Sequence, residues 1–141
     1  MTSWLWLAGL AAVLYGLHQV FTKLASQHIG SGIGGFVVEA TAAVTILIYL
    51  VYTKLAGHWS EPVTAQGVAW SALTGVCVGV GTVAFFLMFQ RGGPLSAVPA
   101  VLAVGAAVMA VVGTVVFREP PSVARVVGVL FALAGLYLLG K

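Results

Sequence analysis

The sequence has few charged residues and a single cysteine. Lysine and arginine together number six, aspartate and glutamate three, and charged residues make up 6% of the chain, against about 25% in soluble domains. So few charges cannot keep a folded globule with 61% hydrophobic residues in solution, and this composition also excludes a disordered chain. Cys77 cannot form an internal disulfide, which excludes a disulfide-stabilised secreted scaffold. These absences indicate an integral membrane protein.

Long apolar runs lie between the charged residues. Each run has about the 20 residues that a helix needs to cross roughly 30 Å of hydrocarbon, and no run shows the alternation of a membrane strand. We therefore expect an all-α membrane protein in which residues 1–141 form a single transmembrane domain. The five predicted transmembrane helices cover residues 3–25, 32–54, 67–90, 94–117 and 122–140.

Two helix starts carry specific expectations. Ser60 or Glu61 is expected to cap the third helix, with Pro62 in its first turn. Pro99 is expected about one turn inside the fourth helix, where it would kink the helix or act as a hinge.

Lysine and arginine are divided evenly between the two membrane faces. Five crossings place three of them on the face of the N-terminus and three on the opposite face: Lys54, Arg118 and Arg125 against Lys23, Arg91 and Lys141. A cytoplasmic excess of these residues normally sets the orientation, and here neither face has an excess. We expect insertion in both orientations and an antiparallel homodimer; the alternative is one orientation set by another feature, such as the terminal amine.

Glu39 is the one charged residue well inside a predicted helix. An acidic residue at the middle of a membrane costs about 2.5–3.5 kcal/mol on insertion scales, so Glu39 should face protein or a water-filled cavity. We expect it to bind protons or substrate, because acidic residues inside membranes often mark ion and proton paths. The alternative is a protonated, structural carboxyl that is hydrogen-bonded to a neighbouring helix.

The first helix carries a polar stripe. Spacings of three and four residues place these side chains on one face: Tyr15, His18, Gln19, Thr22 and Ser26. His18 lies seven residues before the end of its helix and Glu39 seven residues after the start of the next, so both lie about 10 Å from the same face. We expect them to pair, directly or through water, as a proton-coupling device. The alternative is that His18 is a packing residue.

The third helix presents small, hydroxyl and aromatic residues on one broad face. Thr74 and Thr82 on this face are predicted substrate contacts, and Gly75 and Gly79 form a G-x-x-x-G motif that is expected to pack closely against another helix.

Other chemistry is not expected. The sequence has no aspartate, and His28 and His58 lie on opposite faces, which excludes a metal cluster of believable geometry. The G-x-G-x-x-G pattern of residues 30–35 joins two membrane helices without a preceding strand, so we expect no nucleotide cofactor. Basic residues at helix ends account for the net charge of +3 without nucleic acid, and Cys77 should be inert in an apolar helix.

Two stretches resemble a known family. Residues 14–23 (LYGLHQVFTK) are similar to the aromatic-Gly…Lys pattern in the first helix of EamA-type proteins of the drug/metabolite transporter superfamily. Residues 89–140 resemble their penultimate helix, the following Arg118-Glu119 turn, and a last helix with spaced Gly128 and Gly135. Larger members carry two inverted five-helix repeats, so the resemblance implies one half of an inverted-repeat transporter fold, completed by a second chain.

We therefore expect a secondary transporter subunit and not an enzyme. It would move a small organic solute, a metabolite or a cationic or zwitterionic drug-like compound, with proton coupling, as an antiparallel homodimer in the plasma membrane of a bacterium or archaeon. The predicted substrate- and proton-binding residues are Glu39, His18, Tyr15, Gln19, Thr22, Thr74 and Thr82. The alternatives are a flippase for a lipid or a lipid-linked sugar, and a non-transporting membrane subunit.

Overall fold

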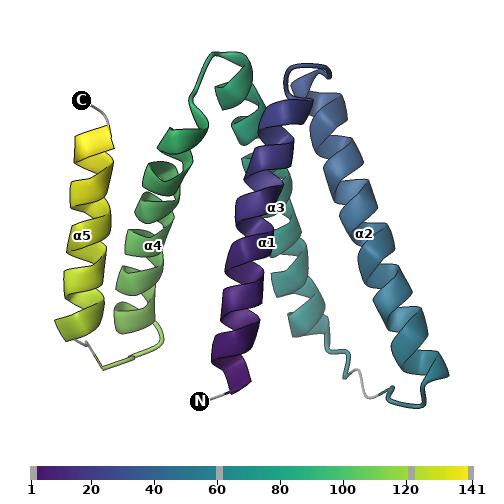
Figure 1. Ribbon diagram of the computed structural model, residues 1–141. Coiled ribbons are helices and arrows are strands. Elements are labelled where there is room, and N and C mark those ends of the chain that lie inside the picture. The colour runs from purple at the N-terminus through teal and green to yellow at the C-terminus, as the bar shows by residue number, and fades with distance from the viewer. Residues whose placement is uncertain (1–2, 60–61, 121–122, 140–141) are drawn as a thin grey trace. The chain divides into compact units, whose positions relative to one another are not determined.

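The computed structural model describes residues 3–59, 62–120 and 123–139, and every element within them is a helix (Figure 1). The predicted all-α class is confirmed for this part of the chain. The elements are α1 (Ser3–Ala25), α2 (Ser31–Leu55), α3 (Ala65–Gln90), a 3-10 turn η1 (Leu95–Ala97), α4 (Val98–Val115) and α5 (Val123–Leu139). With η1 and α4 taken together, the bounds lie within about two residues of the predicted ranges.

Four segments are long and apolar enough to cross a membrane, as expected for an integral membrane protein. They are Trp4–Ala25, Ser31–Leu55, Ala65–Gln90 and Leu95–Val115, of 22, 25, 26 and 21 residues. Helix α5 has 17 residues, fewer than the roughly 20 that a perpendicular crossing needs. The fifth crossing therefore stays a prediction.

The start of α3 differs from the expectation. The side chain of Thr64 caps the helix, and its hydroxyl oxygen accepts a hydrogen bond from the backbone N–H of Gly67 at 3.0 Å. Pro62 therefore lies in the loop before the helix, and its predicted place in the first turn is wrong. Ser60 and Glu61, the predicted caps, lie outside the described residues.

The chain forms two compact units, unit 1 (Met1–Gly92) and unit 2 (Gly93–Lys141). In unit 1, α3 packs against both α1 and α2. Gly34 and Gly35 allow the close approach of α2: a Cβ at Gly34 would lie 2.5 Å from the Phe86 ring, and one at Gly35 would lie 3.0 Å from Val83. Phe86 has no exposed surface. The helix pair α2–α3 is thus closest where α2 begins.

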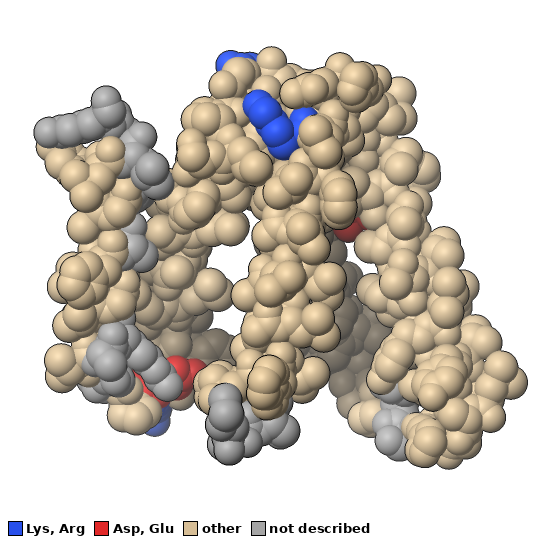
Figure 2. All heavy atoms as spheres, viewed as in Figure 1, with Lys and Arg blue, Asp and Glu red and all other residues tan. Residues whose placement is uncertain are grey.

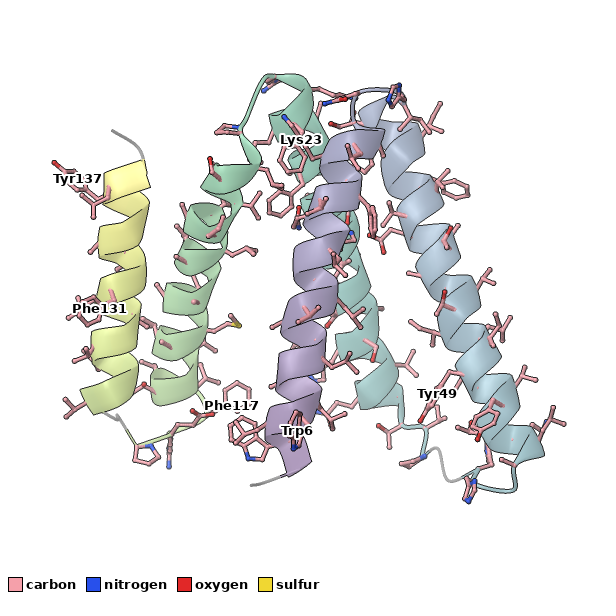
Figure 3. All side chains as sticks on the ribbon, in the orientation of Figure 1. Trp6, Lys23, Tyr49, Phe117, Phe131 and Tyr137 are labelled. Carbon is pink, nitrogen blue, oxygen red and sulfur yellow. The ribbon has the colours of Figure 1, made fainter. Side chains whose placement is uncertain are left out.

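Unit 1 is closed at this end and open at the other. At the closed end, the Gln90 side-chain amide donates a hydrogen bond to the backbone oxygen of Ile29 at 2.9 Å, and the Lys23 ammonium lies 5.1 Å from the centre of the Phe89 ring. At the open end, Trp6 is 71% exposed and Tyr49 is 59% exposed. Figure 3 shows Lys23 and Trp6 near opposite ends of α1, and in Figure 1 α2 diverges from α1 toward the open end.

Unit 2 is an α4–α5 pair that encloses an apolar groove of about 530 Å³. Its walls include Ala107, Ala110, Thr114, Val126, Leu130 and Leu133. Pro99 lies in the first turn of α4, after η1, where the missing N–H would have no intrahelical partner. Within the combined η1–α4 segment, Pro99 lies just after the change from 3-10 turn to α-helix, and a kink or hinge at this point stays a prediction.

Candidate functional site

Glu39, which lies about two turns after the start of α2, forms a hydrogen bond to α3. The hydroxyl of Thr82 donates to Oε1 of Glu39 at 2.6 Å; Thr82 is 5% exposed and Glu39 is half-buried. The glycine contact explains this pairing. Gly35 meets Val83 at the closed end, and Glu39 follows Gly35 by one helical turn on the same face, so its carboxyl reaches Thr82.

The polar stripe of α1 is buried over most of its length. Gln19, Thr22 and Ser26 are 7%, 2% and 6% exposed, and His18 is half-buried. Tyr15 is 68% exposed, and its ring meets the His18 ring edge-on with 6.4 Å between centres. The stripe therefore faces the inside of unit 1 from His18 onward, while Tyr15 lies on its surface.

Two buried polar atoms of α1 lack a hydrogen-bond partner among the described residues: Nδ1 of His18 and Oε1 of Gln19. The neighbouring hydroxyls bind their own helix, since Thr22 donates to the backbone oxygen of His18 and Ser26 to that of Lys23, both at 2.8 Å. An unpaired buried polar atom costs about 1–3 kcal/mol, and most such atoms in proteins are paired. His18 and Gln19 thus provide unused hydrogen-bonding capacity inside a membrane protein.

These atoms lie at about the depth of Thr82. Helices α1 and α3 run in the same direction (Figure 1), and the contact of Lys23 with Phe89 sets their relative level. Thr82 precedes Phe89 by seven residues, about 10 Å, and Gln19 precedes Lys23 by four, about 6 Å. Gln19 and His18 are therefore within about one helical turn of the level of Thr82.

The predicted site residues separate into two groups. Glu39 and Thr82 are in contact, and His18, Gln19 and Thr22 lie on the buried face of α1. Tyr15 and Thr74 belong to the exposed part of unit 1, and the Thr74 hydroxyl donates to the backbone oxygen of Trp70 at 3.0 Å. The structure gives Glu39 a partner on α3, whereas the predicted pairing was with His18, whose Nδ1 is unpaired within the described chain.

Sequence reasoning missed the Gly34–Gly35 pair. Both residues lie inside α2 and set its distance from α3. Two adjacent glycines at the start of an apolar helix were the available signal.

Charge is scarce on the surface shown in Figure 2, where acidic atoms are visible in the hollow between α1 and α2. Glu39 is the acidic residue of unit 1 among the residues that the structure describes. The described residues contain no group of three or more His, Cys, Asp or Glu side chains with the geometry for a metal ion, and Cys77 is free and exposed.

No protein-family model, curated protein or solved structure matches the chain.

Proposed function

We propose that the chain is a subunit of a secondary transporter that moves a small organic solute across the membrane with proton coupling. The carrying observation is the hydrogen bond between Glu39 and Thr82, which holds a carboxyl inside the apolar span of α2. A carboxyl at this depth is costly to insert, and such residues in membrane proteins commonly serve proton or solute binding.

Thr82 suits a carboxyl that changes its protonation state. A hydroxyl both donates and accepts hydrogen bonds, so Thr82 donates to the ionised carboxylate and accepts from the protonated carboxyl. Glu39 therefore keeps a partner in both states. In the proposed cycle, Glu39 holds a proton when the solute is absent and releases it when the solute binds.

A second, oppositely oriented copy completes the proposed transporter. The even division of lysine and arginine between the two membrane faces supports this arrangement. The EamA-like stretches of sequence also support it. In the proposal, five crossings place the two termini on opposite faces of the membrane.

The test uses the full chain reconstituted in vesicles with an imposed pH gradient. Glu39→Gln keeps the shape of the side chain and its hydrogen bond from Thr82, but cannot release a proton. We expect this variant to lose acceleration of solute uptake by the gradient, whereas Glu119→Gln, which alters a carboxyl of unit 2, retains it. Undiminished coupling in Glu39→Gln would remove Glu39 from the mechanism.

A further inference from the structure

Three buried hydroxyl groups of unit 1, those of Thr82, Thr22 and Ser26, have no hydrogen left to give to a ligand. Thr82 donates to Glu39, Thr22 to the backbone oxygen of His18, and Ser26 to that of Lys23. Each hydroxyl has one hydrogen. A molecule that binds among these side chains must therefore supply the donors for hydrogen bonds with these hydroxyls.

In contrast, some buried hydrogen-bond acceptors of unit 1 have no donor. Oε1 of Gln19 and Nδ1 of His18 are buried without a partner in the described part of the chain, and the Gln19 side chain is 93% buried. The hydrogen bond from Thr82 uses one carboxylate oxygen of Glu39, which leaves Oε2 for a second donor. An amide oxygen and a carboxylate oxygen accept hydrogen bonds, and an imidazole nitrogen accepts one when the ring proton is on the other nitrogen.

The charge of Glu39 also favours a ligand that carries N–H groups. An ionised Glu39 in an apolar helix is stabilised by a cation, and hydrogen bonds to charged groups contribute more than neutral ones. A quaternary ammonium ion supplies the charge but no N–H hydrogen, so it would leave the amide oxygen of Gln19 unpaired. A site built to hydrogen-bond a substrate N–H rejects the analogue that lacks it for this reason.

We infer that the site recognises an organic cation through its N–H groups, as in a protonated primary or secondary amine or a guanidinium, and discriminates against the quaternary ammonium ion of the same skeleton. The inference names the substrate class of the site and so rests on the proposed transport function. The Glu39 carboxylate pairs with the positive charge, and Gln19 and His18 accept from the remaining N–H groups.

The test compares hexylammonium with hexyltrimethylammonium, which share a charge and an alkyl chain. Binding to the purified full chain is measured by isothermal titration calorimetry at a pH where both probes are cations. We expect hexylammonium to bind about tenfold more tightly or better, the effect of one or more hydrogen bonds to charged groups. Gln19→Leu should reduce the ratio of the two dissociation constants several-fold, while Gln66→Leu, at an exposed glutamine of α3, should preserve it.

Equal affinities, tighter binding of the quaternary ion, or no binding of either probe would each overturn the inference. An unchanged ratio in Gln19→Leu would also overturn it, and His18→Phe provides a second measurement if that variant fails to fold. The proposed role of Glu39 in proton coupling fails on a different result, undiminished proton coupling in Glu39→Gln, which leaves an observed preference for N–H groups standing.

Discussion

The hydroxyl of Thr82 decides whether the carboxyl of Glu39 is satisfied inside unit 1. Replacing Thr82 with valine preserves the branched shape and removes the hydrogen bond to Glu39. We expect Thr82→Val to lower the free energy of unfolding by about 1–3 kcal/mol, the effect of leaving a partly buried polar group unpaired. Thermal unfolding in detergent measures the change.

Two control variants separate the hydrogen bond from other effects. Thr82→Ser keeps the hydroxyl and should retain most of the stability. Thr45→Val removes an exposed hydroxyl that donates to its own helix, at the backbone oxygen of Thr41, and should change the unfolding free energy by less than about 0.5 kcal/mol. Equal losses in Thr45→Val and Thr82→Val would show that the link to Glu39 adds nothing.

Sequence reasoning identified Glu39 and Thr82 but not their contact. Counting residues from the helix ends gives the depth of a side chain and not its rotation about the helix axis, so His18 appeared to be as good a partner as any residue at that depth. The direction in which a side chain points around the helix axis depends on which faces of the two helices are in contact. Here the missing Cβ atoms of Gly34 and Gly35 place one face of α2 on α3, and this face includes Glu39.

At the scale of elements, the α2–α3 contact depends on Gly34. An added methyl group at this position would lie 2.5 Å from the fully buried Phe86 ring, which has little room to move. We expect Gly34→Ala to destabilise the protein by about 1–3 kcal/mol through overpacking, as measured by thermal unfolding.

Gly32 offers a matched control in the same helical turn. A Cβ there would meet nothing within 4 Å, and alanine favours helix over glycine by about 0.5–1 kcal/mol. Gly32→Ala should therefore be neutral or stabilising. If Gly34→Ala were as stable as Gly32→Ala, the close contact of α2 with α3 would be wrong.

The apolar runs in the sequence predict the helices themselves. They do not predict which helix faces meet or the residue at which α3 begins. Gly75 and Gly79 have the spacing of a packing motif, yet a Cβ at either would meet nothing within 4 Å in the described chain, and Gly34 and Gly35, which lack that spacing, make the close contact. Similarly, Ser60, Glu61 and Thr64 all carry side-chain oxygens suited to capping, so residue type alone could not locate the start of α3.

At the scale of the whole molecule, the even division of lysine and arginine predicts a specific response to added charge. Two or three lysines inserted beside Lys54 bias one face, and the same number inserted in the turn after Ala25 bias the other. We expect each biased protein to lose solute uptake when expressed alone, and the two expressed together to recover it. Labelling of both termini reports the orientation.

Full uptake by either biased protein alone would contradict the antiparallel dimer. It would instead show that one orientation suffices, which is the alternative that the sequence leaves open.

The arrangement of unit 1 also determines which part of the protein tryptophan fluorescence reports on. The four tryptophans of the chain lie toward the open end: Trp4 and Trp6 near the start of α1, Trp59 after α2 and Trp70 near the start of α3. Each is more than half exposed, from 51% at Trp59 to 71% at Trp6. The tryptophan fluorescence of the protein therefore reports the solvent exposure of the open end alone, without a contribution from the end near Phe86. Tryptophan fluorescence can therefore follow changes in the separation of α1, α2 and α3 at this end without an added dye.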